Sequence, residues 1–237
     1  MKTKKINSLT ALALIASSTG ASTVFAADGR VYNSDSTITY TPASGPTDPV
    51  DPGDPGTTVD PEGPKNPGTD GPLSIDYASN FNFGTQEITS ADKTYFAAAT
   101  TLTDKTTRPN WVQVTDNRGT LAGWSLSLQA SEFTNGKTGT GSVLSGATLK
   151  LENGHIVSAS DAAADQSVAS VTLTPGTSSG TILGATAGKG AGTNLLVWGD
   201  DTTKATSVSL AVPGKTTKLA DTYQSTLTWT LTDTPAN

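Results

Sequence analysis

The 237-residue sequence has no cysteine, a single histidine, and few aromatic (6%) or charged (15%) residues. The lack of cysteine excludes disulfides, thiolate metal sites and a cysteine nucleophile. His155 alone does not make a histidine-based zinc site. We therefore expect neither a metal nor another cofactor. Export without disulfides fits a Gram-positive surface better than an animal secretory pathway.

Long hydrophobic runs and positive charge are also scarce. The one apolar stretch, residues 9–16, follows Lys2, Lys4 and Lys5 and precedes Val24-Phe25-Ala26, a pattern typical of a secretory signal cleaved after residue 26. It is too short to span a bilayer, so direct membrane insertion is not expected. Removing its three lysines from the 15 basic residues leaves 12 against 21 acidic ones, a net charge of −9. That charge disfavours nucleic acid and anionic lipid as partners.

The composition divides the rest of the chain into three parts. Residues 27–41 form a short segment after the signal, in which Thr37-Ile38-Thr39-Tyr40 has the alternation of a strand. Residues 42–72 hold nine of the 13 prolines among Gly, Asp and Thr. Such a stretch has too few apolar side chains to offset its ordering entropy, and we expect a disordered linker. Residues 73–237 are then the folded domain.

Short alternating apolar runs between turn residues predict an all-β fold for this domain. We favour a β-sandwich, immunoglobulin-like or related, over a barrel. Asn153-Gly154 between two such runs predicts a β-hairpin, and residues 159–166 have at most a weak helical pattern. The expected strands include residues 111–115, 121–129, 147–152, 167–174, 194–198, 207–212 and 223–231.

Catalytic chemistry has little support in the sequence. Gly176-Thr177-Ser178-Ser179-Gly180 matches the G-x-S-x-G pattern, but the only histidine precedes it and no helix pattern follows it. Asp161 with Asp165, and Asp200 with Asp201, are carboxylate pairs typical of solvated loops, although such pairs also bind calcium or sugars. A hydrolase of wall glycans or peptides is therefore the least favoured hypothesis, and we expect no enzyme and no catalytic or metal-binding residue.

The phrase Trp-x-Leu occurs twice, as Trp124-Ser125-Leu126 and Trp229-Thr230-Leu231. The first copy follows Val112-Gln113-Val114-Thr115-Asp116-Asn117-Arg118-Gly119-Thr120, and the second lies close to Asp233-Thr234-Pro235. In this order, after a signal and a Pro-rich stretch, the two copies resemble the WxL domain of Gram-positive surface proteins. The resemblance covers about residues 73–237, and the short region before it indicates a small member of that family.

The resemblance implies an extracellular, non-catalytic protein that associates non-covalently with the cell wall, with peptidoglycan as ligand. It also implies surface protein partners, among them a membrane-anchored one. The motif residues carried over are Trp124, Leu126, Trp229 and Leu231. An alternative hypothesis is that the direct ligand is a partner protein, because a net acidic chain is not attracted to an anionic wall.

The role of the motif residues is open between core and contact. In each copy the Trp and Leu lie on one face of a strand and Ser or Thr on the other, which favours burial of the apolar face. The alternative is a partly open Trp that stacks on a sugar ring. Trp111 and Trp198, at strand ends, are further candidates for an exposed aromatic platform, although core packing is favoured for both.

Overall fold

The computed structural model describes residues 31–45 and 47–237, so the expected signal peptide, residues 1–26, lies outside the described residues. The chain divides into two compact units, Met1–Thr39 and Tyr40–Asn237. Residues 31–39 of the first unit are extended and exposed, with no strand partner. In the described part of the chain, no helix is long and apolar enough to cross a membrane.

The second unit is all-β, as the sequence predicts, and every strand pair is antiparallel. Three four-stranded sheets contain most of the strands. Sheet I has the order β10 (Gly154–Ser158), β14 (Gly192–Trp198), β7 (Asn110–Asp116), β3 (Leu73–Ala78). Sheet II has the order β11 (Gln166–Ser167), β13 (Ser178–Ala185), β8 (Trp124–Ala130), β16 (Leu227–Thr232). Sheet III has the order β12 (Val171–Leu173), β9 (Thr148–Leu151), β15 (Val208–Val212), β4 (Lys93–Phe96).

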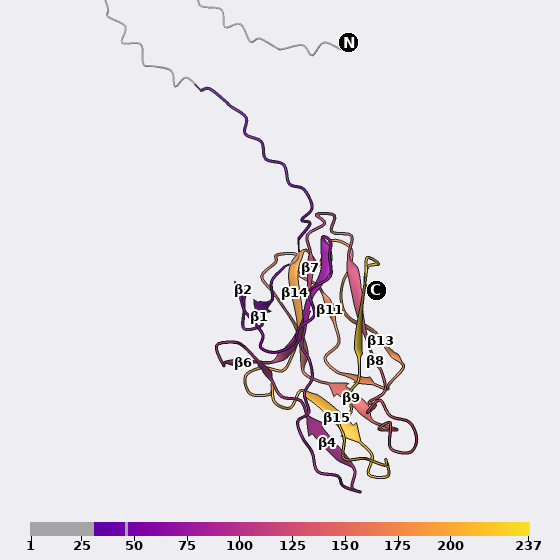
Figure 1. The fold of residues 1–237 in the computed structure, drawn as a ribbon. Helices are drawn as coiled ribbons and strands as arrows, with labels where there is room; N and C mark the ends of the chain where they lie inside the picture. Colours follow the sequence, from indigo (N-terminus) through magenta and orange to yellow (C-terminus); the bar gives the residue numbers. More distant parts are fainter. Residues whose placement is uncertain (1–30, 46) are drawn as a thin grey trace, which may run out of the picture. The chain divides into compact units, whose positions relative to one another are not determined.

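Two short ribbons complete the fold, β1 (Val50–Asp51) with β2 (Asp54–Thr58) and β5 (Thr100–Thr101) with β6 (Thr107–Arg108). Figure 1 shows β4, β9 and β15 together at one end of this unit, beyond β7, β8 and β14. The strands expected at 111–115, 147–152, 194–198 and 207–212 are present within a few residues. The run at 121–129 begins only at Trp124, because Leu121 and Gly123 have left-handed backbone angles (φ of 52° and 80°) that interrupt an extended strand.

Sheets I and II share one hydrophobic core. Val112 and Val114 of β7 belong to the same buried cluster as Leu126 and Leu128 of β8. Along β8 the apolar residues are fully buried, while Ser125 and Ser127 are only partly so, as the alternation predicts. Leu149, Leu151 and Leu173 of sheet III belong to the same cluster, so apolar side chains of all three sheets exclude water together, which is the main stabilising contribution of this unit.

The other face of sheet I is covered as well. Trp111 of β7, on this face, is fully buried in a second cluster with Tyr77, Leu195 and Val197. Val50 and Leu102 complete the cluster from outside the sheet. This double coverage explains why all seven residues of β7 are buried. Sheet I is thus an interior layer.

The Pro-rich stretch provides part of that cover, which corrects the expectation of a disordered linker over residues 42–72. It contains β1 and β2, and Val50 is only 8% exposed. Two contributions order it. Proline restricts the unfolded chain and so lowers the entropy lost on folding, while Val50 and Val59 supply apolar contacts within the cluster that contains Trp111. Composition alone underestimates the order of such a segment, because a few apolar residues suffice to hold it on a large apolar surface of the folded domain.

The predicted hairpin at Asn153-Gly154 is wrong, although the turn is real. Asn153 has a φ of 56°, typical of a tight turn. The strands on either side, however, belong to different sheets: β9 pairs with β12 and β15, and β10 pairs with β14. The turn therefore passes the chain from sheet III to sheet I. No described residue of 159–166 is helical, so the weak helical pattern there is not realised.

Candidate functional site

The first Trp-x-Leu copy lies in the core. Trp124 and Leu126 are both 0% exposed, and the indole Nε1–H of Trp124 donates to the carbonyl of Gly190 at 3.1 Å. Gly190 must lack a side chain, because a Cβ there would lie 2.4 Å from the same indole nitrogen and its φ is +86°. These residues form the fold, as the core interpretation predicts.

The second copy lies beside the first. In the pairing of β16 with β8, Leu231 is opposite Leu126 and Trp229 is opposite Leu128. The two copies of the phrase, about one hundred residues apart in sequence, are therefore neighbours in one sheet. Sequence reasoning gave each copy a strand but contained no signal for this pairing.

Trp229 differs from the other three tryptophans because it is only partly buried. Its strand alternates between half-buried Leu227, Trp229 and Leu231 and exposed threonines. On its inner side the ring packs against Trp198 of sheet I, with centroids 6.0 Å apart. The core interpretation thus holds for Trp124 and Leu126, while Trp229 and Leu231 lie between core and surface.

Trp111 and Trp198 are not an exposed platform. Their exposed fractions are 0% and 1%. Trp111 lies under the Pro-rich segment with its ring 4.5 Å from that of Tyr77, and Trp198 is enclosed by the rings of Phe81 and Trp229. The sequence context predicts strand ends for both, but flanking segments cover the two rings.

A groove of about 1010 Å³ opens beside Trp229. Its lining comes from the segment that follows β3, from the segment leading into β16, and from apolar side chains of sheet III. Aromatic residues are frequent in its lining, and amide side chains add hydrogen-bonding groups. The residues that matter most are Phe81, Phe83, Tyr95, Tyr223 and Trp229, with the amides of Asn80, Asn82, Gln86 and Gln224.

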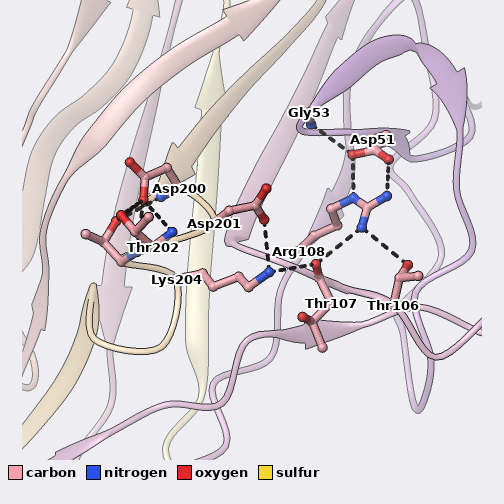
Figure 2. Close-up of polar contacts among 10 residues, drawn as sticks. Asp51, Gly53, Thr106, Thr107, Arg108, Asp200, Asp201, Thr202 and Lys204 are labelled. Atoms are coloured by element: carbon pink, nitrogen blue, oxygen red, sulfur yellow. Dashed lines mark hydrogen bonds and ion pairs between the residues drawn. The ribbon is translucent and has the colours of Figure 1, made fainter.

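An ion pair holds the Pro-rich segment on the outer side of sheet I. Figure 2 shows Asp51 facing the guanidinium of Arg108, whose Nε and Nη2 donate to the two carboxylate oxygens at 2.7 Å each. Gly53 N–H donates to the same carboxylate. The hydrogen bond from Arg108 lowers the pKa of Asp51, so this carboxylate stays charged in mildly acidic solution.

A buried amide network supports the same contact. The side chain of Gln113 accepts from the N–H of Val50 at 2.8 Å and donates to the carbonyl of Asp48 and to Asp76. Asp76 is itself buried, and loss of hydration raises its pKa. β7 therefore holds the Pro-rich segment with polar as well as apolar groups.

The candidate catalytic and metal-binding groups do not form a site. Nδ1 of His155 is 3.2 Å from the carbonyl of Asn153, two residues away, and Asp200 accepts hydrogen bonds from Thr202 and Thr203 within its own turn, which lower its pKa. Asp201 pairs with Lys204, whose ammonium also donates to the carbonyl of Thr107 (Figure 2). Within residues 31–45 and 47–237, no group of three or more acidic or histidine side chains is arranged to hold a metal.

Residues 27–235 match the family described as "WxL domain surface cell wall-binding". The chain belongs to the WxL domain family. This WxL protein is accordingly a non-catalytic cell-surface protein that associates non-covalently with the cell wall. No curated protein and no solved structure matches it. The matched range of the WxL protein includes the Pro-rich stretch, from which Val50 and Val59 pack into the apolar cluster on the outer face of sheet I.

Proposed function

We propose that the WxL protein binds peptidoglycan directly, with its glycan strand in the groove beside Trp229. The observation that carries this proposal is the partial exposure of Trp229 on the wall of the groove, when the other three tryptophans are buried. An indole face offers apolar contact to the C–H face of a sugar ring, and neighbouring amides offer hydrogen bonds to its hydroxyl groups. The motif Trp is then a contact residue on its outer side and a core residue on its inner side.

We also propose that sheets I and II are the two layers of a β-sandwich. Support comes from their shared apolar cluster, to which both sheets contribute alternate side chains. The glycan groove lies where the edge strands β3 and β16 of the two layers are not joined, since residues 75–83 and 218–229 line it. The segments that follow β3 and lead into β16 form the walls of the groove at this open side of the proposed sandwich.

Co-sedimentation with protein-free peptidoglycan sacculi tests direct binding. Wild type is expected to pellet saturably, and Trp229→Ala to bind at least about tenfold more weakly, a loss of roughly 1.4 kcal/mol. Thr230→Ala is the matched control, because that side chain is the neighbour on the opposite, exposed face. Circular dichroism of each variant establishes that it is folded.

Two results would contradict the proposal. A folded Trp229→Ala protein that pellets like wild type would remove the groove as the glycan site. Wild type that stays in the supernatant would show that wall association needs a partner protein. The second candidate function, docking of a surface protein, is favoured by the open edge of β16 described below.

A further inference from the structure

β16 is an edge strand without the usual protection. Its one strand partner in the described chain is β8, and their register has no bulge. Ser131 N–H donates to the carbonyl of Thr226, which fixes the phase of the ladder: Thr228, Thr230 and Thr232 point their backbone groups toward β8. The N–H and C=O groups of Leu227, Trp229 and Leu231 therefore point outward.

The sequence of β16 favours a further strand at this edge. Residues 227–232 contain no proline and no charge, and β-branched, aromatic and leucine residues fill the strand. Natural edge strands generally carry lysine, proline or a bulge that prevents pairing. The edge of β3 is different, because Thr69 N–H already donates to the carbonyl of Ile75 and a register shift follows. β16 is thus the open edge beside the groove.

The same chain carries an unpaired segment with a strand pattern. Val31, Tyr32, Ile38 and Tyr40 are between 73% and 92% exposed, more than any other large apolar residue in the described chain. From residue 36 to 41 the segment is uncharged and alternates Thr37, Thr39 and Thr41 with Ile38 and Tyr40. A six-residue segment with this β propensity and no charge or proline is typical of strands that pair between chains.

We propose that residues 36–41 of one copy add to β16 of a second copy as an antiparallel strand. Ile38 and Tyr40 then cover the outer side of Trp229 and Leu231 at the mouth of the groove. The threonines of the donor strand lie beside Thr228, Thr230 and Thr232 on the exposed face, as cross-strand pairs. Both strands lack charge, so the net acidity of the chain is not concentrated at this contact.

The tether of the segment favours a second copy over the same chain. Ala43 N–H donates to the carbonyl of Asn117, just after β7. Arg118 bonds both Asp116 and Gly123, so this point lies at the end of β8 where Ser125 pairs with Thr232. From there the chain's own segment reaches β16 only in parallel orientation. All strand pairs in the described chain are antiparallel, and a second copy is free to add in that orientation.

Because each copy has one donor segment and one acceptor edge at different places, the contact is head-to-tail. Repeated addition builds open chains rather than a closed dimer. The added strand covers Trp229, so a copy that accepts a strand does not stack a sugar at that ring. Strand addition itself needs no glycan, so crosslinking and assembly are measured without peptidoglycan.

Single-cysteine variants test the contact directly, because the natural chain has no cysteine. One protein carries Thr37→Cys, Thr39→Cys or Thr41→Cys, and the other carries Thr228→Cys, Thr230→Cys or Thr232→Cys. Under mild oxidation, antiparallel addition predicts mixed disulfides between the two proteins. The cysteine at position 37 should prefer the one at position 232, and the cysteine at position 41 should prefer the one at position 228. Thr103→Cys, an exposed threonine elsewhere, is the control for random collision.

Three outcomes would overturn the proposal. Equal crosslinking to Thr103→Cys would mean collision rather than pairing. A preference of 37 for 228 and of 41 for 232 would mean a parallel strand. A double variant Thr39→Cys/Thr230→Cys that closes its disulfide within one chain at high dilution, while single-cysteine mixtures form none, would place the segment on its own β16.

Assembly in solution gives an independent readout. Light scattering or analytical ultracentrifugation of wild type is expected to show mass rising with concentration. Ile38→Lys is expected to raise the apparent dissociation constant at least about tenfold, while Thr39→Lys, on the other face of the same strand, changes it little. Both variants lie in an exposed segment, so folding of the domain is not at issue. A monomer at all concentrations, or equal effects of the two variants, would contradict strand addition.

Ile38→Lys should still pellet with sacculi, so failure of this inference is distinguishable from failure of glycan binding.

Discussion

At the residue scale, the same short phrase has two different environments. Trp124 is enclosed and hydrogen-bonded through its indole to Gly190, while Trp229 packs against Trp198 and also lines the groove. The difference arises from strand position, because β8 is interior to sheet II and β16 is at its edge. An interior strand buries its apolar face completely, and an edge strand leaves part of it accessible.

Trp124→Ala is expected to cost more stability than Trp229→Ala. Truncation of a fully buried Trp in a packed core lowers the free energy of unfolding by about 3–5 kcal/mol. Truncation of a half-buried ring lowers it by roughly half as much, because that ring buries less apolar area in the folded state. Urea unfolding followed by far-ultraviolet circular dichroism measures both. Equal costs would show that Trp229 is as much a core residue as Trp124.

The Asp51–Arg108 pair predicts a loss of stability in acid. The pKa of Asp51 is lowered in the folded protein, so its stabilising contribution is complete above the ordinary value of 3.8 and decreases as the pH falls below it. Charge-assisted hydrogen bonds of this kind contribute about 1.5–3 kcal/mol. Asp51→Asn should therefore be less stable than wild type at pH 7, with the difference shrinking below pH 3.8.

Unfolding free energies at several pH values, measured on both proteins, check this expectation. Asp76 acts in the opposite direction, since burial raises its pKa and the folded state is then favoured by protonation as the pH falls. The comparison of wild type with Asp51→Asn cancels that contribution. A difference that stays constant down to low pH would contradict the role given to Asp51.

At the element scale, the Pro-rich segment is a structural cover. Its ribbon of β1 and β2 lies over β7 and keeps water from Trp111. Proline and glycine are poor in apolar surface, which is why composition predicts disorder for this stretch. The cover depends instead on Val50, on the Asp51 ion pair and on the buried amide of Gln113.

Removal of residues 47–62 is expected to destabilise the protein by at least about 2 kcal/mol, because it uncovers Trp111 and removes the hydrogen bonds of Gln113 to Val50 and Asp48. Urea unfolding measures the free energy, and a red shift of tryptophan emission reports exposure of the ring. Removal of residues 31–41, which are exposed throughout, is the control and should leave the stability of the monomer unchanged when it is measured at low protein concentration. Equal stability of both shortened proteins would restore the linker interpretation.

At the scale of the whole molecule, the net negative charge affects how the protein approaches the cell wall. A chain with 21 acidic residues and at most 15 basic ones is repelled by anionic wall polymers. Binding to peptidoglycan must therefore rely on contacts at close range, such as the aromatic and amide groups of the groove. These contacts are little affected by salt, whereas the long-range repulsion is screened within about 10 Å at 0.1 M.

Binding to sacculi should consequently rise when repulsion is weakened. We expect more protein to pellet at about 0.15 M salt than at about 0.01 M, where the screening length is about 30 Å. Stripping anionic polymers from the wall should have the same effect at low salt. Binding that falls as salt is added would show that attraction between charges, rather than the groove, holds the protein on the wall.

The sequence by itself determined the all-β class and the family. Alternation of apolar and hydroxyl residues in 124–130 and 227–232 predicts strands because the side-chain period of a strand is two, whatever the rest of the chain does. The ordered pair of Trp-x-Leu phrases indicates the WxL domain, and the match to that family over residues 27–235 confirms this prediction. Burial of Trp124 and Leu126 also follows from that local pattern.

Only the tertiary structure decided which strands are neighbours and which aromatic faces stay open. Leu126 meets Leu231, Asn153-Gly154 passes between sheets rather than within a hairpin, and residues 47–62 cover Trp111. Each of these depends on contacts between residues far apart in the chain, and a local period carries no information about them. β16 lies at the edge of its sheet, so Trp229 lies beside a groove and the outer backbone groups of the strand have no strand partner. This position depends on the order of all the strands in the sheet and on no single segment.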